Sequence, residues 1–435
     1  MRERSKETVF CSRPGSFKEP NSSIVLPNKT CNTRSHKLQM FVGLLVLAML
    51  SFCIAFSYTL KSFQEAFTSP LFIWSKETIF AHMDINETIF LHSTIDPWAA
   101  QEQDKIKALL DIDFNGNETG KQHFQYNKAM QANMMTQRTA LTHRSDEKKL
   151  PSQIFTPKYA SHWSTFQSLL LAWASNKRHE PQVMRELLLL TKDPIDRHYN
   201  QTIDLRTAKP YRNCAVVGNS GILLDNTYGS FIDSHEMVMR LNNARIYGFK
   251  DSVGTKTTIS FMNSNVLHSC SNRPRCYCHP YGENVPIVAY MCQVVHLMDV
   301  ALCSSWHKAP LIVTDPRFDG LCMRIAKYYS LKTFFHSTGR SVDDWSRVHD
   351  GIMFHYSSGM QAVMVAVGMC EEVSIFGFGK SAHAKHHYHT NQRGELSLHD
   401  YEAEYAFYRD LVNGSISIPF LDQAGISLPR VHIFS

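Results

Sequence analysis

NCAVVGNSGILLDNTYGSFIDSHEMVMRLNNARIYGFKDSVGTKTTISFMN, residues 213–263, has the pattern of a nucleotide-binding half-domain. Its apolar run Cys214–Val217 predicts a buried strand, and the turn at 218–221 leads from that strand into an apolar helix start at Ile222. Because free backbone N–H groups at a helix N-terminus can hold a phosphate, we expect this turn to form one wall of a site for a phosphorylated ligand.

Strands and helices alternate along the rest of the chain. Apolar runs predict strands at 236–241, 257–262, 286–290, 310–313 and 372–377, and helical spacing predicts helices at 292–301, 319–330, 359–370 and 398–412. Such alternation is typical of an α/β fold with a largely parallel sheet. We therefore expect a single α/β domain over residues 156–435.

Two features argue against a dinucleotide site. The turn at 218–221 lacks the GxGxxG pattern, and Asn242 and Asn243 stand where a ribose-binding acid is expected after the next strand. An asparagine side chain both donates and accepts hydrogen bonds, which suits a phosphate oxygen or a sugar hydroxyl. The stretch therefore predicts a nucleotide site of another kind.

Composition gives no sign of a nucleic-acid partner. The chain has 435 residues, of which 43% are hydrophobic, and a net charge of +6. The charge is spread along the chain, without a basic stripe interleaved with aromatic residues.

A membrane anchor is predicted at residues 40–60, where 21 residues carry no charged side chain. As a helix this run would be about 30 Å long, which matches the hydrocarbon core of a bilayer. Residues 1–39 hold eight Lys or Arg against three acids, which predicts that they form a cytosolic tail and that the rest is lumenal. We expect a single-pass, type II membrane protein.

Residues 61–155 are polar and weakly periodic, and we expect them to form a lumenal stem. The acidic pair Asp111 and Asp113 could hold a divalent metal, but no strand leads into it, and we favour solvated acids. Sequons for glycosylation on the lumenal side begin at Asn86, Asn117, Asn200 and Asn413.

Eight of the eleven cysteines follow residue 60 and would lie in an oxidising compartment, where disulfides are the default expectation. The group Cys270, Cys276, Cys278 and His279 offers a zinc site as an alternative. Its CxC spacing departs from the CxxC of zinc knuckles, so we favour disulfides.

Ser357, Ser358 and Gly359 open a predicted helix whose apolar residues recur at intervals of four. The polar start offers hydroxyls, backbone N–H groups and the positive end of the helix dipole to an anion. An ordinary capped helix is the alternative interpretation.

Five histidines fall within residues 383–399, and they could bind zinc, although the loop gives no clean ligand set. His399 stands apart, because Ser397 as N-cap and Asp400 as capping-box partner predict that it lies in the first turn of a helix. The positive end of the macrodipole would keep its imidazole neutral, as a general base requires. A surface or capping histidine is the alternative.

These stretches resemble the four ordered motifs of the eukaryotic sialyltransferase family. The long motif resembles residues 213–263, with CAVVGNSG and VGTKTT close to the family wording, and the short motif resembles SSGMQAVMVAVGMCEEVSIFGFG at 357–379. The third motif resembles HHYH at 386–389, and the HxxxxE motif resembles HDYEAE at 399–404. The cysteine-rich insertion and the stem look like the plant sialyltransferase-like branch.

The resemblance implies a Golgi membrane glycosyltransferase of variant GT-A, Rossmann-like fold. It would transfer an acid sugar, sialic acid or Kdo, from a CMP donor to a glycan or pectic acceptor, with inversion and without a metal cofactor. The implied CMP-sugar-binding residues are Asn219, Asn242, Ser357, Ser358 and Gly359, with His387 on the leaving phosphate, His399 as base and a disulfide between Cys214 and Cys370.

Two alternatives stay open. Ile222 and the pair His389-Thr390 depart from the family pattern, which leaves a non-catalytic Golgi relative that binds nucleotide or glycan. A metal-dependent transferase that uses UDP-sugars would instead depend on Asp111 and Asp113.

Overall fold

The computed structural model describes residues 84–96, 99–111, 161–199, 209–271, 279–349, 354–390, 399–414 and 417–435. These residues belong to one compact unit, Met83–Ser435. The predicted cytosolic tail and the anchor at 40–60 lie outside the described residues. Within the described part of the chain, no helix combines the length and the apolar character needed to cross a membrane.

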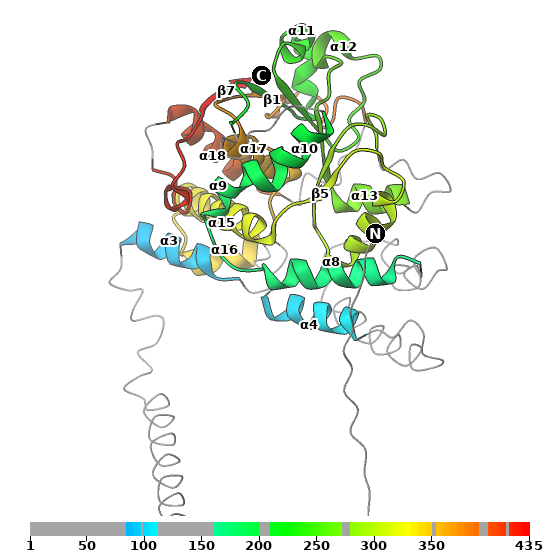
Figure 1. Ribbon diagram of the computed structural model, residues 1–435. Coiled ribbons are helices and arrows are strands. Elements are labelled where there is room, and N and C mark those ends of the chain that lie inside the picture. Colours follow the sequence, from blue (N-terminus) through cyan, green and yellow to red (C-terminus); the bar gives the residue numbers. More distant parts are fainter. Residues whose placement is uncertain are drawn as a thin grey trace, which may run out of the picture. The chain divides into compact units, whose positions relative to one another are not determined.

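The centre of the unit is a seven-stranded sheet with the order β5-β4-β3-β2-β1-β6-β7, in which every neighbouring pair is parallel. The strands are β1 (Cys214–Val217), β2 (Met237–Leu241), β3 (Ile259–Asn263), β4 (Ile287–Tyr290), β5 (Leu311–Val313), β6 (Glu372–Phe376) and β7 (Arg430–Phe434). The chain runs outward from β1 to β5 and then returns to the other side of β1, so the strand order reverses between β1 and β6 (Figure 1). The predicted α/β fold with a mostly parallel sheet is confirmed.

Helices precede, connect and follow the strands. They are α3 (Ile85–Thr94), α4 (Ala99–Leu110), α8 (Trp163–Ser175), α9 (Val183–Leu187), η2 (Leu188–Lys192), α10 (Asp193–His198), η3 (Gly221–Asp225), α11 (Gly229–Asp233), α12 (Lys250–Val253), α13 (Ser264–Ser271), η4 (Val294–His296), α14 (Leu297–Ser304), α15 (Pro316–Thr338), α16 (Val342–Val348), α17 (Ser358–Met369), α18 (Tyr401–Asn413) and η5 (Asp422–Ala424).

Apolar clusters cover both faces of the sheet. Successive side chains of a strand point to opposite faces. Cys214 and Val216 of β1 therefore join the largest cluster, which contains residues of α9, α15, α17 and α18. Ala215 and Val217 join a separate cluster with residues of η3, α11 and α12. Because all four residues of β1 are buried, this strand is an unbroken apolar run in the sequence.

Several element boundaries differ from the predictions. The helix predicted from residue 221 is the short 3₁₀-helix η3, and β7 was not predicted. Two helices, α3 and α4, lie in the segment predicted as stem. Ile89 of α3 is 1% exposed and belongs to the main core, where α3 packs against α15. Residues 112–160 are not described, so the boundary between stem and domain stays a prediction.

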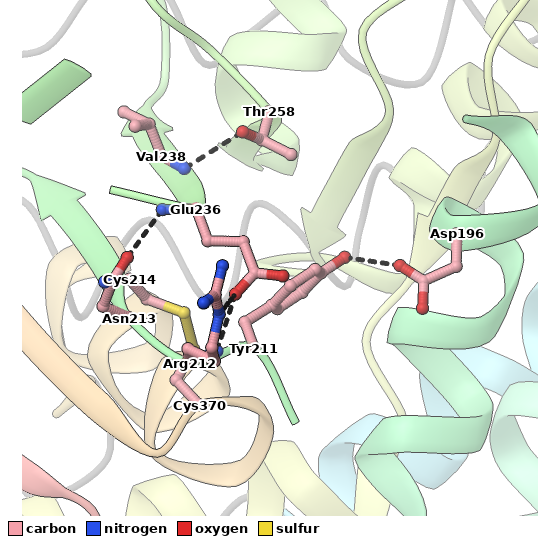
Figure 2. Close-up of a disulfide and its surroundings, with 9 residues drawn as sticks. All are labelled: Asp196, Tyr211, Arg212, Asn213, Cys214, Glu236, Val238, Thr258 and Cys370. Carbon is pink, nitrogen blue, oxygen red and sulfur yellow. Dashed lines mark hydrogen bonds and ion pairs between the residues drawn. A yellow bond between two sulfur atoms is a disulfide. The ribbon is translucent and has the colours of Figure 1, made fainter. Parts of the chain in front are cut away.

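A disulfide joins Cys214 at the start of β1 to Cys370 just before β6, with a Cα–Cα distance of 6.2 Å (Figure 2). This pairing, implied by the family resemblance, is confirmed. Cys303 is also disulfide-bonded, whereas Cys292 and Cys322 are free thiols. The default of disulfides for all cysteines after residue 60 was therefore wrong for these two, because burial in the core, rather than pairing, accommodates their sulfur atoms.

Candidate active site

The site lies at the carboxyl edge of the sheet, where the strand order reverses. In open parallel sheets, ligands bind in the crevice outside the carboxyl ends of the strands at such a point. Here β1 is followed directly by Gly218, and a Cβ atom on Gly218 would lie 2.6 Å from the carbonyl oxygen of Gly377, which follows β6. Glycine therefore allows the ends of the two central strands to approach closely.

Asn219 follows Gly218 just beyond the carboxyl end of β1. Its backbone carbonyl oxygen accepts a hydrogen bond from the Tyr388 N–H at 2.8 Å, so the turn after β1 supports the histidine loop, residues 383–389. Its side-chain Oδ1 is buried, and no described residue donates a hydrogen bond to it. A buried acceptor without a donor is costly, so a ligand N–H or O–H at this position would be stabilising.

Asn242 has a left-handed backbone with φ of 53°, a conformation that asparagine tolerates better than most residues. Its Oδ1 accepts from the Asn263 N–H at 3.0 Å. Asn263 in turn donates from Nδ2 to the Ser358 hydroxyl at 3.0 Å. These contacts connect the ends of β2 and β3 with the start of α17, and they bring together two residues that the sequence predicted for the nucleotide.

Asn263 was not predicted as a site residue. The signal was present, because a polar side chain that ends an apolar strand at the carboxyl edge is the same feature that drew attention to Asn242. Its Oδ1 also accepts from the Val266 N–H at 3.0 Å, which fixes the start of α13.

Ser357 caps α17, since its hydroxyl oxygen accepts from the Met360 N–H at 3.2 Å. The same hydroxyl donates to Oε2 of Glu404 at 2.5 Å, and the Ser357 N–H donates to Oε1 at 2.6 Å. Burial raises the pKa of Glu404 to about 7, and the hydrogen bonds from Ser357 oppose that rise. Glu404 therefore fixes the start of α17. The Ser357 hydroxyl hydrogen is donated to Glu404 and not to a ligand.

Gly359 is the third predicted residue at the start of α17. A Cβ atom there would lie 2.8 Å from the ring of Phe378, closer than real Cβ contacts. A side chain at this position would displace that ring. Ser357, Ser358 and Gly359 thus occupy one helix start at the crevice, where a helix N-terminus favours an anion.

His399 lies just before α18. Its Nδ1 is 3.1 Å from the carbonyl oxygen of His355, and its ring meets the His355 ring edge to face at 4.7 Å. A carbonyl oxygen only accepts, so Nδ1 carries the hydrogen and Nε2 is the unprotonated, basic nitrogen. Burial, and then the neighbouring His355, lower the pKa of His399 to about 4.

The predicted position of His399 in the first turn of a helix was wrong. The N-cap of α18 is Asp400, whose side chain accepts from the Ala403 N–H at 3.1 Å, and the helix begins at Tyr401. Ser397, the predicted N-cap, lies outside the described residues. The neutral imidazole that we expected from the macrodipole is therefore favoured mainly by burial.

The histidine loop lies beside His399. The ring of Tyr401 meets both His399, at 5.7 Å between centroids, and His386, at 5.6 Å. His386 and His387 stack at 4.5 Å. Burial, and then the neighbouring histidines, lower the pKa of His387 to about 4, so its resting form is the neutral imidazole. A phosphate beside the ring would raise that pKa again.

Two imidazoles of the loop, those of His386 and His389, have a buried nitrogen. Nε2 of His386 and Nε2 of His389 have no hydrogen-bond partner in the part of the chain that the structure describes. Lys380 places its ammonium 4.1 Å from the centroid of the Tyr401 ring. The loop thus brings imidazole nitrogens near His399, and the ammonium of Lys380 lies over Tyr401 just before the loop.

The remaining predicted residues are distributed away from this group. Asn86 in α3 and Asn413 at the end of α18 are exposed, whereas Asn117 and Asn200 lie outside the described residues. Asp111 is exposed after α4, and Asp113 is not described. Among the described residues, the histidine loop supplies no set of three ligand atoms close enough for a metal ion.

Comparison of the sequence with known proteins identifies the family of this chain. The profile of glycosyltransferase family 29 (sialyltransferase) matches residues 147–416. The chain is 47% identical to "Beta-1,6-galactosyltransferase GALT29A" of Arabidopsis thaliana over 351 residues, which are 80% of this chain and 86% of that protein. It is 56% identical to "Sialyltransferase-like protein 1" of Oryza sativa subsp. indica over 266 residues, which are 60% of this chain and 64% of the rice protein.

More distant relatives come from mammals. The chain is 31% identical over 214 residues to "CMP-N-acetylneuraminate-beta-galactosamide-alpha-2,3-sialyltransferase 2" of Mus musculus, which covers 46% of this chain and 54% of the mouse protein. A crystal structure of a mammalian sialyltransferase aligns at a TM-score of 0.34 and 21% identity, over 65% of this chain and 96% of that chain. The family profile and the plant relatives show that the chain belongs to glycosyltransferase family 29, in its plant sialyltransferase-like branch.

Proposed function

We propose that this protein transfers a galactosyl group from a nucleotide-activated donor to a hydroxyl of a glycan, in a β-1,6 linkage, with His399 as the general base. The observation that carries the choice of sugar is the 47% identity to a β-1,6-galactosyltransferase across 80% of this chain. Identity to the mouse sialyltransferase is lower and covers 46% of the chain.

The geometry around His399 supports the role of base. A sugar hydroxyl has a pKa far above 7, so its proton must be accepted as the new bond forms. The hydrogen bond from Nδ1 to the His355 carbonyl oxygen leaves Nε2 as the nitrogen that can accept it. A donor whose sugar is α-linked gives a β-linked product by one inverting displacement, and this chemistry needs a single base.

The crevice offers several groups to a negatively charged leaving group. The start of α17 directs backbone N–H groups toward it, His387 lies on the histidine loop, and Lys380 precedes that loop. The nearby carboxylates already accept hydrogen bonds within the protein. Glu404 accepts from the Ser357 N–H, and Asp400 accepts from the Ala403 N–H at the start of α18. We propose that these nitrogen donors, rather than a metal ion, offset the charge of the departing nucleotide.

Asn219 and Asn242 would hold the nucleotide. Oδ1 of Asn219, which has no donor among the described residues, can accept a hydrogen bond from a base N–H or a ribose hydroxyl. In the described part of the chain, the Nδ2 of Asn242 meets no acceptor, while its Oδ1 is occupied by Asn263. Nδ2 can therefore donate to a phosphate oxygen.

A second candidate is transfer of an acid sugar, sialic acid or Kdo, from a CMP donor to a glycan or pectic acceptor. The four motifs shared with sialyltransferases favour it, and Lys380 beside the histidine loop could pair with the carboxylate of such a sugar. The same base and the same inversion apply, so the two candidates differ in donor and not in mechanism.

We further place the protein in the Golgi membrane as a single-pass type II protein with the catalytic unit in the lumen. The charge-free run at 40–60 and its basic flank support this topology. The disulfide between Cys214 and Cys370 also supports it, since disulfides persist in oxidising compartments.

A donor screen tests the proposal. The full chain, purified in detergent from a secretory host, is incubated with UDP-galactose, CMP-sialic acid or CMP-Kdo and with β-galactan or pectic acceptors, each with and without a chelator. We expect transfer from UDP-galactose, unchanged by the chelator, and a 6-linked product by NMR. Transfer only from a CMP donor supports the second candidate, and CMP or UDP binding without transfer from any donor supports a non-catalytic relative.

A further inference from the structure

A buried group of metal-ligand side chains lies apart from the histidine loop. It consists of His268 in α13, His296 at the end of η4 and Asp299 in α14. One ligand atom from each of the three lies within 4.8 Å of the others. In the described part of the chain, this is the only set of three such side chains gathered this closely.

Hydrogen bonds already orient the two imidazoles. Nδ1 of His268 is 2.8 Å from Oδ2 of Asp299, and the rings of His268 and His296 stack at 4.7 Å with an angle of 14°. Nδ1 of His296 is 2.9 Å from the hydroxyl of Ser264, which also accepts from the Cys292 N–H at 2.9 Å. Metal-binding histidines are commonly held through the ring nitrogen that does not bind the metal, as Ser264 holds Nδ1 of His296 here.

The other nitrogen of His296 has no such partner. The side chain of His296 is 2% exposed, and its Nε2 finds no hydrogen-bond partner among the residues that the structure describes. A buried polar atom left without a partner costs about 1–3 kcal/mol. The stacked imidazole of His268 and the carboxylate of Asp299, itself 2% exposed, are the groups gathered beside it.

We propose that His268, His296 and Asp299 bind a divalent transition-metal ion of the Zn²⁺ class, which ties α13 to α14. Two imidazoles and one carboxylate form a common ligand set for Zn²⁺, with the fourth position open to water or a further ligand. The site is distinct from the histidine loop.

The geometry requires only a small adjustment. With bonds of about 2.0–2.1 Å, ligand atoms on one zinc ion lie about 3.4 Å apart and at most about 4.2 Å apart. Here the ligand atoms lie within 4.8 Å of one another, so metal binding would require side-chain rotations that draw the more distant atoms together and widen the 2.8 Å contact between His268 and Asp299. If Nδ1 of His268 binds the metal, its hydrogen moves to the other ring nitrogen, so no net proton needs to leave.

The ion would brace one wall of the active site. α13 begins directly after Asn263, whose contacts reach Asn242 and Ser358. By joining α13 to η4 and α14, the metal would hold the end of β3 in place. Its role is structural, so its presence does not depend on which sugar donor the enzyme uses.

Metal analysis of the full chain tests the proposal directly. The protein is expressed without a polyhistidine tag, purified in detergent, and its zinc is measured by mass spectrometry. We expect about one zinc per chain in the wild type and a loss of about fivefold or more in His296→Gln and His268→Ala. His383→Ala, which removes an exposed histidine of the loop, should keep the wild-type content.

Two further measurements keep the result interpretable. Co²⁺ bound in place of Zn²⁺ should give the visible absorption of a four-coordinate ion in the wild type and not in His268→Ala, a variant at a partly exposed position. Added Zn²⁺ should raise the melting temperature of the wild type but not of that variant. The proposal is overturned if the wild type takes up no zinc even when Zn²⁺ is supplied, if His296→Gln and His268→Ala retain it, or if His383→Ala loses it.

Discussion

Replacing both Cys214 and Cys370 with alanine should remove a large part of the stability of the catalytic unit while leaving its chemistry intact. The disulfide spans a sequence separation of 156 residues. Chain entropy for a closed loop of that length gives about 5 kcal/mol near room temperature. Because the total stability of a folded domain is about 5–15 kcal/mol, the loss would be a substantial fraction of it.

The estimate of about 5 kcal/mol is an upper limit for the effect of opening the loop. Denatured chains retain structure, and removal of native disulfides usually costs about 2–5 kcal/mol. Loss of the two sulfur atoms from buried positions also adds a small cavity cost. Cys322→Ala supplies the matched control, because Cys322 is a buried free thiol and its replacement removes a sulfur atom without opening a loop.

Activity should respond differently from stability. Cys214 begins β1 and Cys370 precedes β6, so both lie at the amino edge of the parallel sheet. Asn219 and Ser358 lie at the opposite, carboxyl edge. We therefore expect the folded fraction of the double variant to keep its kcat/KM.

Urea unfolding of wild type, Cys214→Ala/Cys370→Ala and Cys322→Ala measures the effect, followed by intrinsic fluorescence without reductant. With a slope of about 3 kcal/mol per molar urea, the midpoint of the double variant should fall by about 1 M or more. The reasoning is refuted if the double variant is no less stable than Cys322→Ala, or if its folded fraction loses activity at a temperature where it remains folded.

Three further predictions concern the site. The pKa of His399 is lowered to about 4, and only the neutral imidazole can act as the base. The value of kcat/KM should therefore rise with pH through about 4 and be constant around pH 6.5. A fall in kcat/KM on acidification with a midpoint near pH 6.5 would contradict this. Glu404→Gln removes an acceptor from Ser357 and should cost about 1–3 kcal/mol in thermal unfolding; an unchanged melting temperature would argue against the anchor. Asn263→Ala should raise the donor KM about tenfold, a loss of about 1.4 kcal/mol, whereas the exposed neighbour Asn265→Ala should not; equal effects would remove the case for Asn263.

Some parts of the fold could be predicted from the sequence because a single local pattern determines each of them. β1 was predicted with its observed bounds, since a strand buried on both faces is an unbroken apolar run and a glycine turn ends it. Helix α3 was missed because its buried residues, Thr88, Ile89 and Ser93, include two polar side chains and make no apolar stripe. Strand β7 was missed because it is at the sheet edge and only Val431 is fully buried there.

The site was predictable in its residue types more than in its contacts. Ser358 and Asn242 were found from their places at a helix start and a strand end. Asn263, which links them, makes its contacts across 21 and 95 residues of sequence, and no local pattern reports such a link. The neutral state of His399 was expected from a helix dipole, but burial, which depends on the tertiary structure, is its largest cause.

The central claim, that the crevice transfers a sugar with His399 as base, is tested most directly by the rate of the chemical step in His399→Ala. Single-turnover transfer is measured for this variant, the wild type and His383→Ala with whichever donor the wild type uses. Loss of a general base should lower the rate by about 10²–10⁴ in His399→Ala and leave His383→Ala unchanged. A His399→Ala rate within about tenfold of the wild type, or equal losses in both variants, would contradict the assignment.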